Sequence, residues 1–137
     1  MQADIVLSVD PGREKCGIAV VHRQQGVSYK AIMETADLAA VASKLAVTHN
    51  ITTVVIGDRT TSQTAQAAIA KLKPNNQTLK IVPVDEHRST DAARIRYWQE
   101  NPPKGLKRLI PTTLQVPPVP VDDYVALILA ERYFAGG

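Results

Sequence analysis

The stretch from Ile5 to Gly12 constrains the fold of this chain more than any other. Its residues run Ile-Val-Leu-Ser-Val, and the first charge after them is Asp10. Side chains of a strand alternate between two faces, so Val6, Ser8 and Asp10 share one face and the other face is wholly apolar. Because both faces are largely apolar, we expect a central strand that is covered on both sides.

The end of this strand offers a candidate functional carboxylate. Pro11 has no N–H to donate and favours an extended conformation for Asp10, and Gly12 permits a sharp turn. Asp10 is therefore predicted at the mouth of a rigid sheet. Asp-Pro-Gly is also good turn chemistry in its own right, so a purely structural role stays open from this stretch alone.

The order of the remaining elements predicts the fold class. Turn signals separate strands over 5–10, 17–21 and 27–33, and such short connections favour an antiparallel meander. Later periodicity predicts helices over 38–50, 63–73, 89–100 and 122–134, with strands over 51–57 and 79–84 between them. This order implies an α/β fold with a mixed five-stranded sheet and helices on both faces. Pro83 suggests that the fifth strand is an edge strand.

The predicted helices also carry cap candidates. These are Thr35 or Asp37 for the first helix, Thr61 or Ser62 for the second, and Ser89 or Thr90 for the third.

Length and composition fit one domain over residues 1–137, large enough for a full hydrophobic core. The single cysteine, Cys16, excludes an internal disulfide and a cysteine-based zinc site. No apolar run approaches a membrane span, and no signal-peptide pattern opens the chain. A cytoplasmic location without a membrane partner is expected.

Three acids stand at the ends of predicted elements. Asp10 ends the first strand, Glu86 follows the fifth, and Asp122 opens the final helix. If the strand order brings them together, their repulsion calls for cations, and oxygen ligands suit Mg²⁺ or Mn²⁺. Two such ions, about 4 Å apart, would orient a water and stabilise the leaving oxygen of a phosphodiester. Taken singly, each acid also fits a loop or helix-cap role.

Basic residues gather near two of these acids, although the formal net charge is only +3. Arg13 and Lys15 follow Asp10, and Arg88 follows Glu86. Further along, the span to residue 108 is rich in basic residues and poor in acids, with Arg94, Arg96, Lys104, Lys107 and Arg108. Such a span can face nucleic-acid phosphates, and an ordinary solvated surface is the alternative. The candidate phosphate contacts are Arg13, Lys15, Arg88, Lys104, Lys107 and Arg108.

Two further segments stay open. Tyr97 and Trp98 could stack on an unpaired base, although helix core is the commoner role of such a pair. The span 101–120 holds six prolines and no clear periodicity, which predicts a long functional or mobile loop. Asp58 is an additional acid for which turn formation is the preferred interpretation.

Three motifs resemble one nuclease family. Residues 10–20, DPGREKCGIAV, resemble the opening motif of the RuvC and YqgF/RuvX nucleases. Residues 84–93, VDEHRSTDAA, resemble the D-E-R-x-[ST]-T-x-x-A segment of YqgF. Residues 122–134 are similar to the final helix of that family, whose opening aspartate is catalytic.

The resemblance implies a ribonuclease H-like fold and a two-metal phosphodiesterase, either endonuclease or exonuclease. Asp10, Glu86 and Asp122 would be its catalytic metal ligands. It also implies a substrate of structured RNA or branched DNA, since YqgF members are linked to trimming precursor 16S ribosomal RNA and to Holliday-junction resolution.

Three departures bear on the substrate contacts. The family often has Gly-Leu-Pro after the fourth strand, where this chain has residues 56–60, IGDRT. His87 stands where Arg is usual, and the span 101–120 is proline-rich where relatives carry a Gly- and Lys-bearing loop.

Competing hypotheses remain. A nucleic-acid-binding relative without catalysis would keep the acids. A sugar-kinase-type phosphotransferase would need two such domains to enclose ATP. The choice of RNA or DNA, and of monomer or homodimer, stays open.

Overall fold

The structure is a computed structural model that describes residues 2–59 and 62–136. Its strands are β1 (Ile5–Asp10), β2 (Lys15–His22), β3 (Gly26–Glu34), β4 (Thr53–Gly57) and β5 (Lys80–Val84). Its α-helices are α1 (Leu38–His49), α2 (Ser62–Ala70), α3 (Ser89–Glu100) and α4 (Asp122–Phe134). Short 3-10 turns lie at η1 (Thr35–Asp37), η2 (Pro74–Asn76), η3 (Gly105–Leu109) and η4 (Thr112–Leu114).

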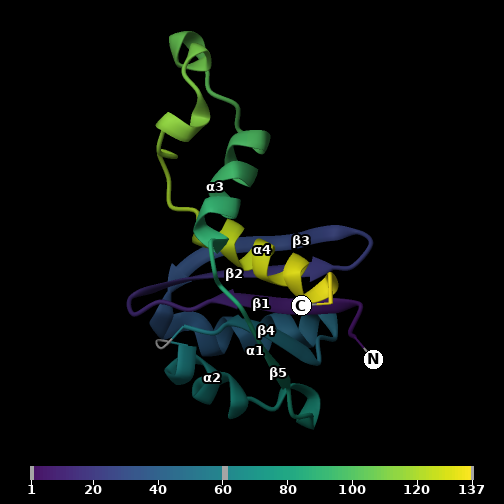
Figure 1. The fold of residues 1–137 in the computed structure, drawn as a ribbon. Coiled ribbons are helices and arrows are strands. Elements are labelled where there is room, and N and C mark those ends of the chain that lie inside the picture. The colour runs from purple at the N-terminus through teal and green to yellow at the C-terminus, as the bar shows by residue number, and fades with distance from the viewer. Residues whose placement is uncertain (1, 60–61, 137) are drawn as a thin grey trace.

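The five strands form one mixed sheet in the order β3-β2-β1-β4-β5 (Figure 1). β2 runs antiparallel to both β1 and β3, while β1 pairs parallel with β4 and β4 pairs parallel with β5. The predicted fold class is therefore confirmed, with β1 in the centre. Pro83 lies on the edge strand β5, where its missing N–H costs no ladder hydrogen bond on the open side.

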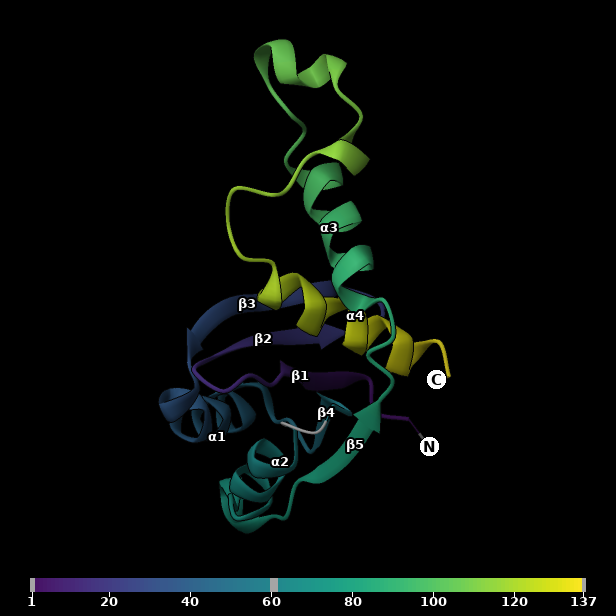
Figure 2. The same ribbon diagram turned by 60° about the vertical axis from the view of Figure 1, so that its left-hand side comes forward.

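Each face of the sheet is covered by helices, as the apolar faces of β1 require. Val6 packs with α4 in one hydrophobic core, and Leu7 and Val9 pack with α1 in the other. Figure 2 shows α4 lying across one face and α1 and α2 on the opposite face. Thirteen residues form α4, and eight of them are buried, so this helix is the main cover of its face.

Several predicted element ends were wrong. Asn50 leaves the helix in a left-handed conformation (φ 54°), and the Ile51 N–H bonds back to the Ala46 carbonyl, so β4 begins only at Thr53. α2 ends at Ala70 rather than near 73, ahead of the buried Pro74. The predicted fifth strand, 79–84, begins at Lys80.

The predicted caps also differ from the structure. Neither Thr35 nor Asp37 caps α1 through its side chain. The Thr35 hydroxyl instead donates to the Gly12 carbonyl at 2.9 Å, which ties η1 to the turn after Asp10. Thr61 lies outside the described residues.

The span 101–120, which we call the arm, is the long loop that the sequence predicts, and most of its residues are exposed. It contains η3 and η4, and it continues α3 away from the sheet before returning to α4 (Figures 1 and 2). Leu106 and Leu109 on it are 85% and 76% exposed. Among the described residues, no helix has the length and apolar character needed to cross a membrane.

Candidate active site

The parallel strands bring two predicted site residues together. Asp10 ends β1, and Glu86 follows the end of β5, which lies two strands away in the sheet. Both residues therefore lie at the carboxyl ends of the parallel strands. The Glu86 side chain is 3% exposed. Burial and the neighbouring carboxyl groups of Glu86 and Asp122 raise the pKa of Asp10 to about 8. The like charges of these neighbours therefore favour a proton on Asp10.

Glu86 is anchored through one of its two oxygens. Its Oε2 accepts a hydrogen bond from the Arg59 backbone N–H at 3.0 Å, and the Arg59 Nε lies 3.4 Å away. The Glu86 backbone N–H in turn donates to Asp58 Oδ1 at 3.3 Å. Glu86 Oε1 is buried and has no hydrogen-bond donor within the described residues. This oxygen is available for a shared proton or a cation.

Asp122 lies at the same site because α4 begins there. Burial raises its pKa, the charge of Asp123 adds to the rise, and Lys15 opposes it. The side chain remains partly exposed. The charge of Asp122 also contributes to the raised pKa of Asp10.

Two glycines make this convergence possible. Gly17 pairs with Asp10 across the β1–β2 ladder, and a Cβ at Gly17 would overlap the backbone carbonyl of Asp122. A Cβ at Gly57, the last residue of β4, would overlap the carboxyl end of Glu86. The sequence analysis assigned neither glycine a role. The available signal was that a glycine within a strand often marks a close approach of another group.

Asp58 and Arg59 were also missed as parts of the site. Asp58 supports the Glu86 backbone, so its role goes beyond the turn that the sequence analysis preferred. The signal was their position directly after β4, since polar residues at the carboxyl ends of parallel strands commonly line sites. Asp85 supports the same loop, because its Oδ1 accepts from the His87 N–H at 2.9 Å and its carbonyl accepts from Arg132 at 2.7 Å.

The donor set fits a divalent cation in part. Within residues 2–59 and 62–136, no three His, Cys, Asp or Glu side chains are grouped as a metal site. Asp10 and Glu86 nevertheless offer the carboxylate oxygens that divalent cations prefer, and Glu86 Oε1 is buried without a hydrogen-bond donor. The two carboxylates repel each other when both are ionised. Asp10 and Glu86 would therefore suit the binding of one cation, with Asp122 beside them.

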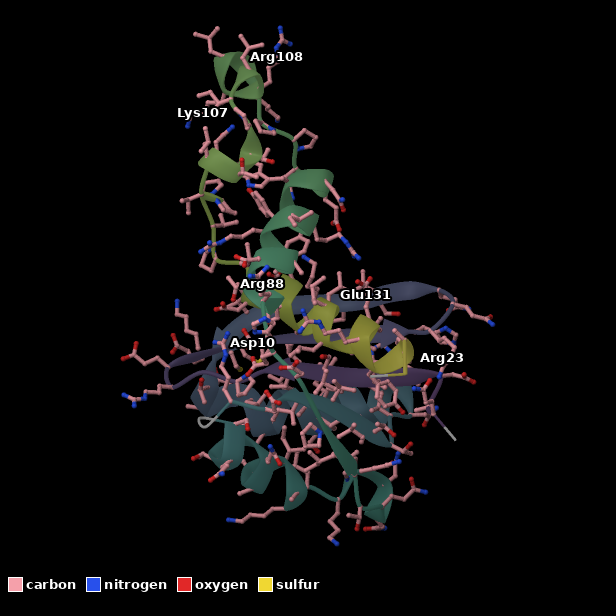
Figure 3. The ribbon with its side chains drawn as sticks, viewed as in Figure 1. Asp10, Arg23, Arg88, Lys107, Arg108 and Glu131 are labelled. Carbon is pink, nitrogen blue, oxygen red and sulfur yellow. The ribbon has the colours of Figure 1, made fainter. Side chains whose placement is uncertain are left out.

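The predicted phosphate contacts fall into two groups. Arg13 lies in the turn that leaves Asp10, and Lys15 is the first residue of β2. Arg88 is exposed in the loop after Glu86, where its backbone is left-handed (φ 56°). The second group belongs to the arm and comprises Lys104, Lys107 and Arg108. Figure 3 shows Arg88 at the base of α3, on the side of Asp10, and Lys107 and Arg108 near the tip of the arm. The acids and the arm are thus separate parts of one surface.

This sheet order, with α4 carrying an acid to the end of β1, defines a ribonuclease H-like fold. No protein-family model matches the sequence, and no curated protein matches it.

Solved structures of RuvC-type resolvases share this fold. RuvC of T. thermophilus in complex with a Holliday junction substrate matches with a TM-score of 0.65 at 15% identity, over 96% of this chain and 94% of that chain. The resolvase of Fowlpox virus in complex with Holliday junction DNA matches with a TM-score of 0.59 at 12% identity, over 96% and 97%. At these identities the likeness establishes the fold.

Proposed function

We propose that this protein is a divalent-metal-dependent nuclease that hydrolyses phosphodiester bonds of structured nucleic acid. The observation that carries the proposal is the pair formed by Asp10 and Glu86 at the mouth of the sheet, with the charge of Asp122 beside it. Such a concentration of buried acids is costly unless it serves a cation or a proton. The ribonuclease H-like fold, shared with resolvases solved in complex with Holliday junctions, agrees with it.

In this proposal Asp10, Glu86 and Asp122 hold the metal, and a two-metal centre would draw its oxygen ligands from all three. Bound divalent cations supply an activated water and neutralise charge on the reacting phosphate. Arg59 fixes the orientation of Glu86 through Oε2 and leaves Oε1 free. Asp10 must release its proton before it can act as a ligand. Arg13, Lys15 and Arg88 would hold the phosphates that flank the reacting one.

The sequence motifs and the fold suggest two substrates. The segment 84–93 resembles YqgF, a family linked to the trimming of precursor 16S ribosomal RNA. The fold neighbours were solved with Holliday junctions, which favours branched DNA. A resolvase is expected to work as a homodimer so that it can cut symmetrically, whereas an RNA-trimming enzyme can act as a monomer.

Cleavage tests the proposal directly. The purified protein is incubated with a four-way DNA junction or a precursor rRNA fragment, with Mg²⁺, Mn²⁺ or chelator. We expect metal-dependent cutting of one substrate by the wild type and by Asp37→Asn, which changes an exposed acid outside the proposed ligand set, and none by Asp10→Asn. Equal cutting by Asp10→Asn, or cutting in chelator, would reject the proposed site.

A second candidate function is a nucleic-acid-binding protein without catalysis. It is favoured by the absence of a three-ligand metal group among the described residues, and by a raised pKa that lets a proton relieve the acid pair instead of a metal. Tight binding of a junction or RNA without any cleavage, by a folded wild-type protein with either metal, would select this alternative.

A further inference from the structure

A groove runs between α3 and the returning half of the arm, apart from the acid site. Its volume is about 560 Å³, and its lining includes Ile95, Trp98, Leu114 and Val116. Three of these are well exposed apolar side chains, with Ile95 at 60% and both Leu114 and Val116 at 76%. A volume of this size suits a small planar group such as a nucleobase.

Trp98 contributes an aromatic ring to this groove. Its ring meets the edge of Tyr97 at a centroid distance of 5.1 Å, and Tyr97 meets Tyr124 of α4 at 5.9 Å. Tyr97 packs against the core on the α4 face, which is the commoner role that its sequence suggested. Trp98 lines the groove instead. The indole is therefore a partly exposed aromatic surface in the groove.

The charges around the groove select its occupant. Arg94 and Asp91 line it, and the arm carries Lys104, Lys107 and Arg108 with no acid between residues 101 and 121. A polyanion fits this surface. A second copy would bring an equally basic arm, so arm-to-arm contact between copies is opposed by like charges.

We propose that the groove receives an unpaired base of a nucleic acid strand, with Trp98 and the apolar lining in contact with the base and the basic residues of the arm on its phosphates. Bases stack on aromatic side chains with little regard to sequence, and backbone phosphates are held by Lys and Arg. The inference rests on the proposed function, because it assigns part of the same substrate to a second site. It predicts that the protein binds strands with unpaired bases more tightly than a uniform duplex.

Trp98 itself provides the readout, because it is the single tryptophan of the chain. Wild-type protein in chelator, where cleavage is suppressed, is titrated with a single-stranded oligothymidine. Controls are a strand of equal length with abasic sites and a duplex of equal length. We expect the base-bearing strand to quench Trp98 fluorescence, and we expect little quenching by the abasic strand, which has the same phosphates but no base.

Two leucines of the arm form a matched pair of variants. Leu114 lines the groove and is 76% exposed, whereas Leu106 is 85% exposed and does not line it. Leu114→Ser is expected to weaken binding of the base-bearing strand about tenfold, with the salt dependence unchanged, and Leu106→Ser to leave it unchanged. Both side chains are largely in solvent, so neither change should unfold the protein.

Equal quenching by the abasic strand, or equal effects of the two serine variants, would overturn the inference. The inference would also be overturned if the protein bound no nucleic acid and Trp98 fluorescence responded instead to anionic vesicles or to a protein. The nuclease proposal fails separately. Base-dependent quenching without metal-dependent cleavage would support the base-binding groove and reject the nuclease. Metal-dependent cleavage without base-dependent quenching would support the nuclease and reject the base-binding groove.

Discussion

Asp10 is the residue whose environment departs most from that of a free carboxyl group. Its pKa is raised from 3.8 to about 8, chiefly by burial and then by the neighbouring Glu86. The folded protein therefore holds a proton that the unfolded chain releases above pH 4. Below the unfolded pKa of 3.8, Asp10 is protonated in both states and its full contribution to the stability is present. That contribution falls as the pH rises towards about 8, and the stability changes little with Asp10 above that pH.

Asp10→Asn should remove this pH dependence in metal-free protein. Asparagine carries no charge, so at pH 9 the variant escapes the burial and repulsion that destabilise the wild type. We expect its free energy of unfolding to exceed that of the wild type by about 2 kcal/mol at pH 9, less than the full shift implies because Asp10 keeps some contact with water. Denaturation in chelator at pH 5 and pH 9 measures this. A wild type with equal stability at both values would contradict the raised pKa.

Divalent cations should stabilise the wild type in the same pH range. Above pH 8, Mg²⁺ or Mn²⁺ can replace the missing proton between Asp10 and Glu86, and binding to the folded state raises its melting temperature. We expect a rise of several degrees at saturating metal for the wild type and Asp37→Asn, and almost none for Asp10→Asn. Equal rises in all three proteins would place the metal elsewhere. This measurement does not depend on activity.

The two glycines predict different patterns of rescue. Gly17→Ala and Gly57→Ala should each destabilise by about 2 kcal/mol, because a Cβ has no room at either position. The obstacle at Gly57 is the Glu86 side chain, so Glu86→Ala should restore much of the stability of Gly57→Ala. The obstacle at Gly17 is backbone, so Asp122→Ala should not rescue Gly17→Ala. Denaturant titrations of the single and double variants give both coupling energies, and similar rescue at the two positions would refute this account.

At the level of the residue, sequence reasoning found the carboxyl groups and missed what surrounds them. The positions of Asp10 and Glu86 at strand ends follow from local patterns, and the strand order then implies that they meet. Gly17, Gly57 and Arg59 act on groups distant in sequence, so their roles depend on the approach of α4 and of the loop after β5. No local pattern carries that information.

The elements were predicted more fully than their ends. Five strands and four helices follow from periodicity and turn residues, and short connections predict the antiparallel meander of the first three strands, but not the places of β4 and β5 in the sheet. The ends depend on local competition, such as the left-handed Asn50 that delays β4. The prolines of the arm predict its long loop, but its short 3-10 turns could not be predicted because they have no apolar period.

The arm should act as a positively charged element for nucleic acid. Replacing Lys104, Lys107 and Arg108 together with Gln removes three phosphate contacts and should lower the slope of log K against log salt by about 2 to 3 for a duplex or branched DNA. The matched control replaces Lys71, Lys73 and Lys80, which are equally exposed at the far end of α2 and the start of β5 (Figure 1). If the slope of log K against log salt fell equally in both triple variants, the arm would have no special role in binding phosphates.

For the whole molecule, the arm is expected to be dispensable for folding. Its ends are close together, since Asn101 Nδ2 lies 3.4 Å from the Tyr124 hydroxyl. Replacing residues 103–116 with a Gly-Ser linker of about six residues should change the unfolding free energy by less than about 1 kcal/mol, while weakening nucleic-acid binding at least tenfold. Thermal unfolding and titration measure the two effects. A deletion that abolishes cooperative unfolding would show that the arm supports the core.

The docking of α4 also sets when the acid site comes into being during folding. Until α4 reaches the sheet, the face of β1 and β2 that bears Val6, Ala19 and Val21 is exposed to solvent. Asp10 then lacks Asp122, because that residue arrives with the helix. Contacts between such distant parts of the chain close late and slowly. A nascent or partly unfolded copy is therefore prone to associate through its bare sheet, and it carries no assembled carboxylate cluster.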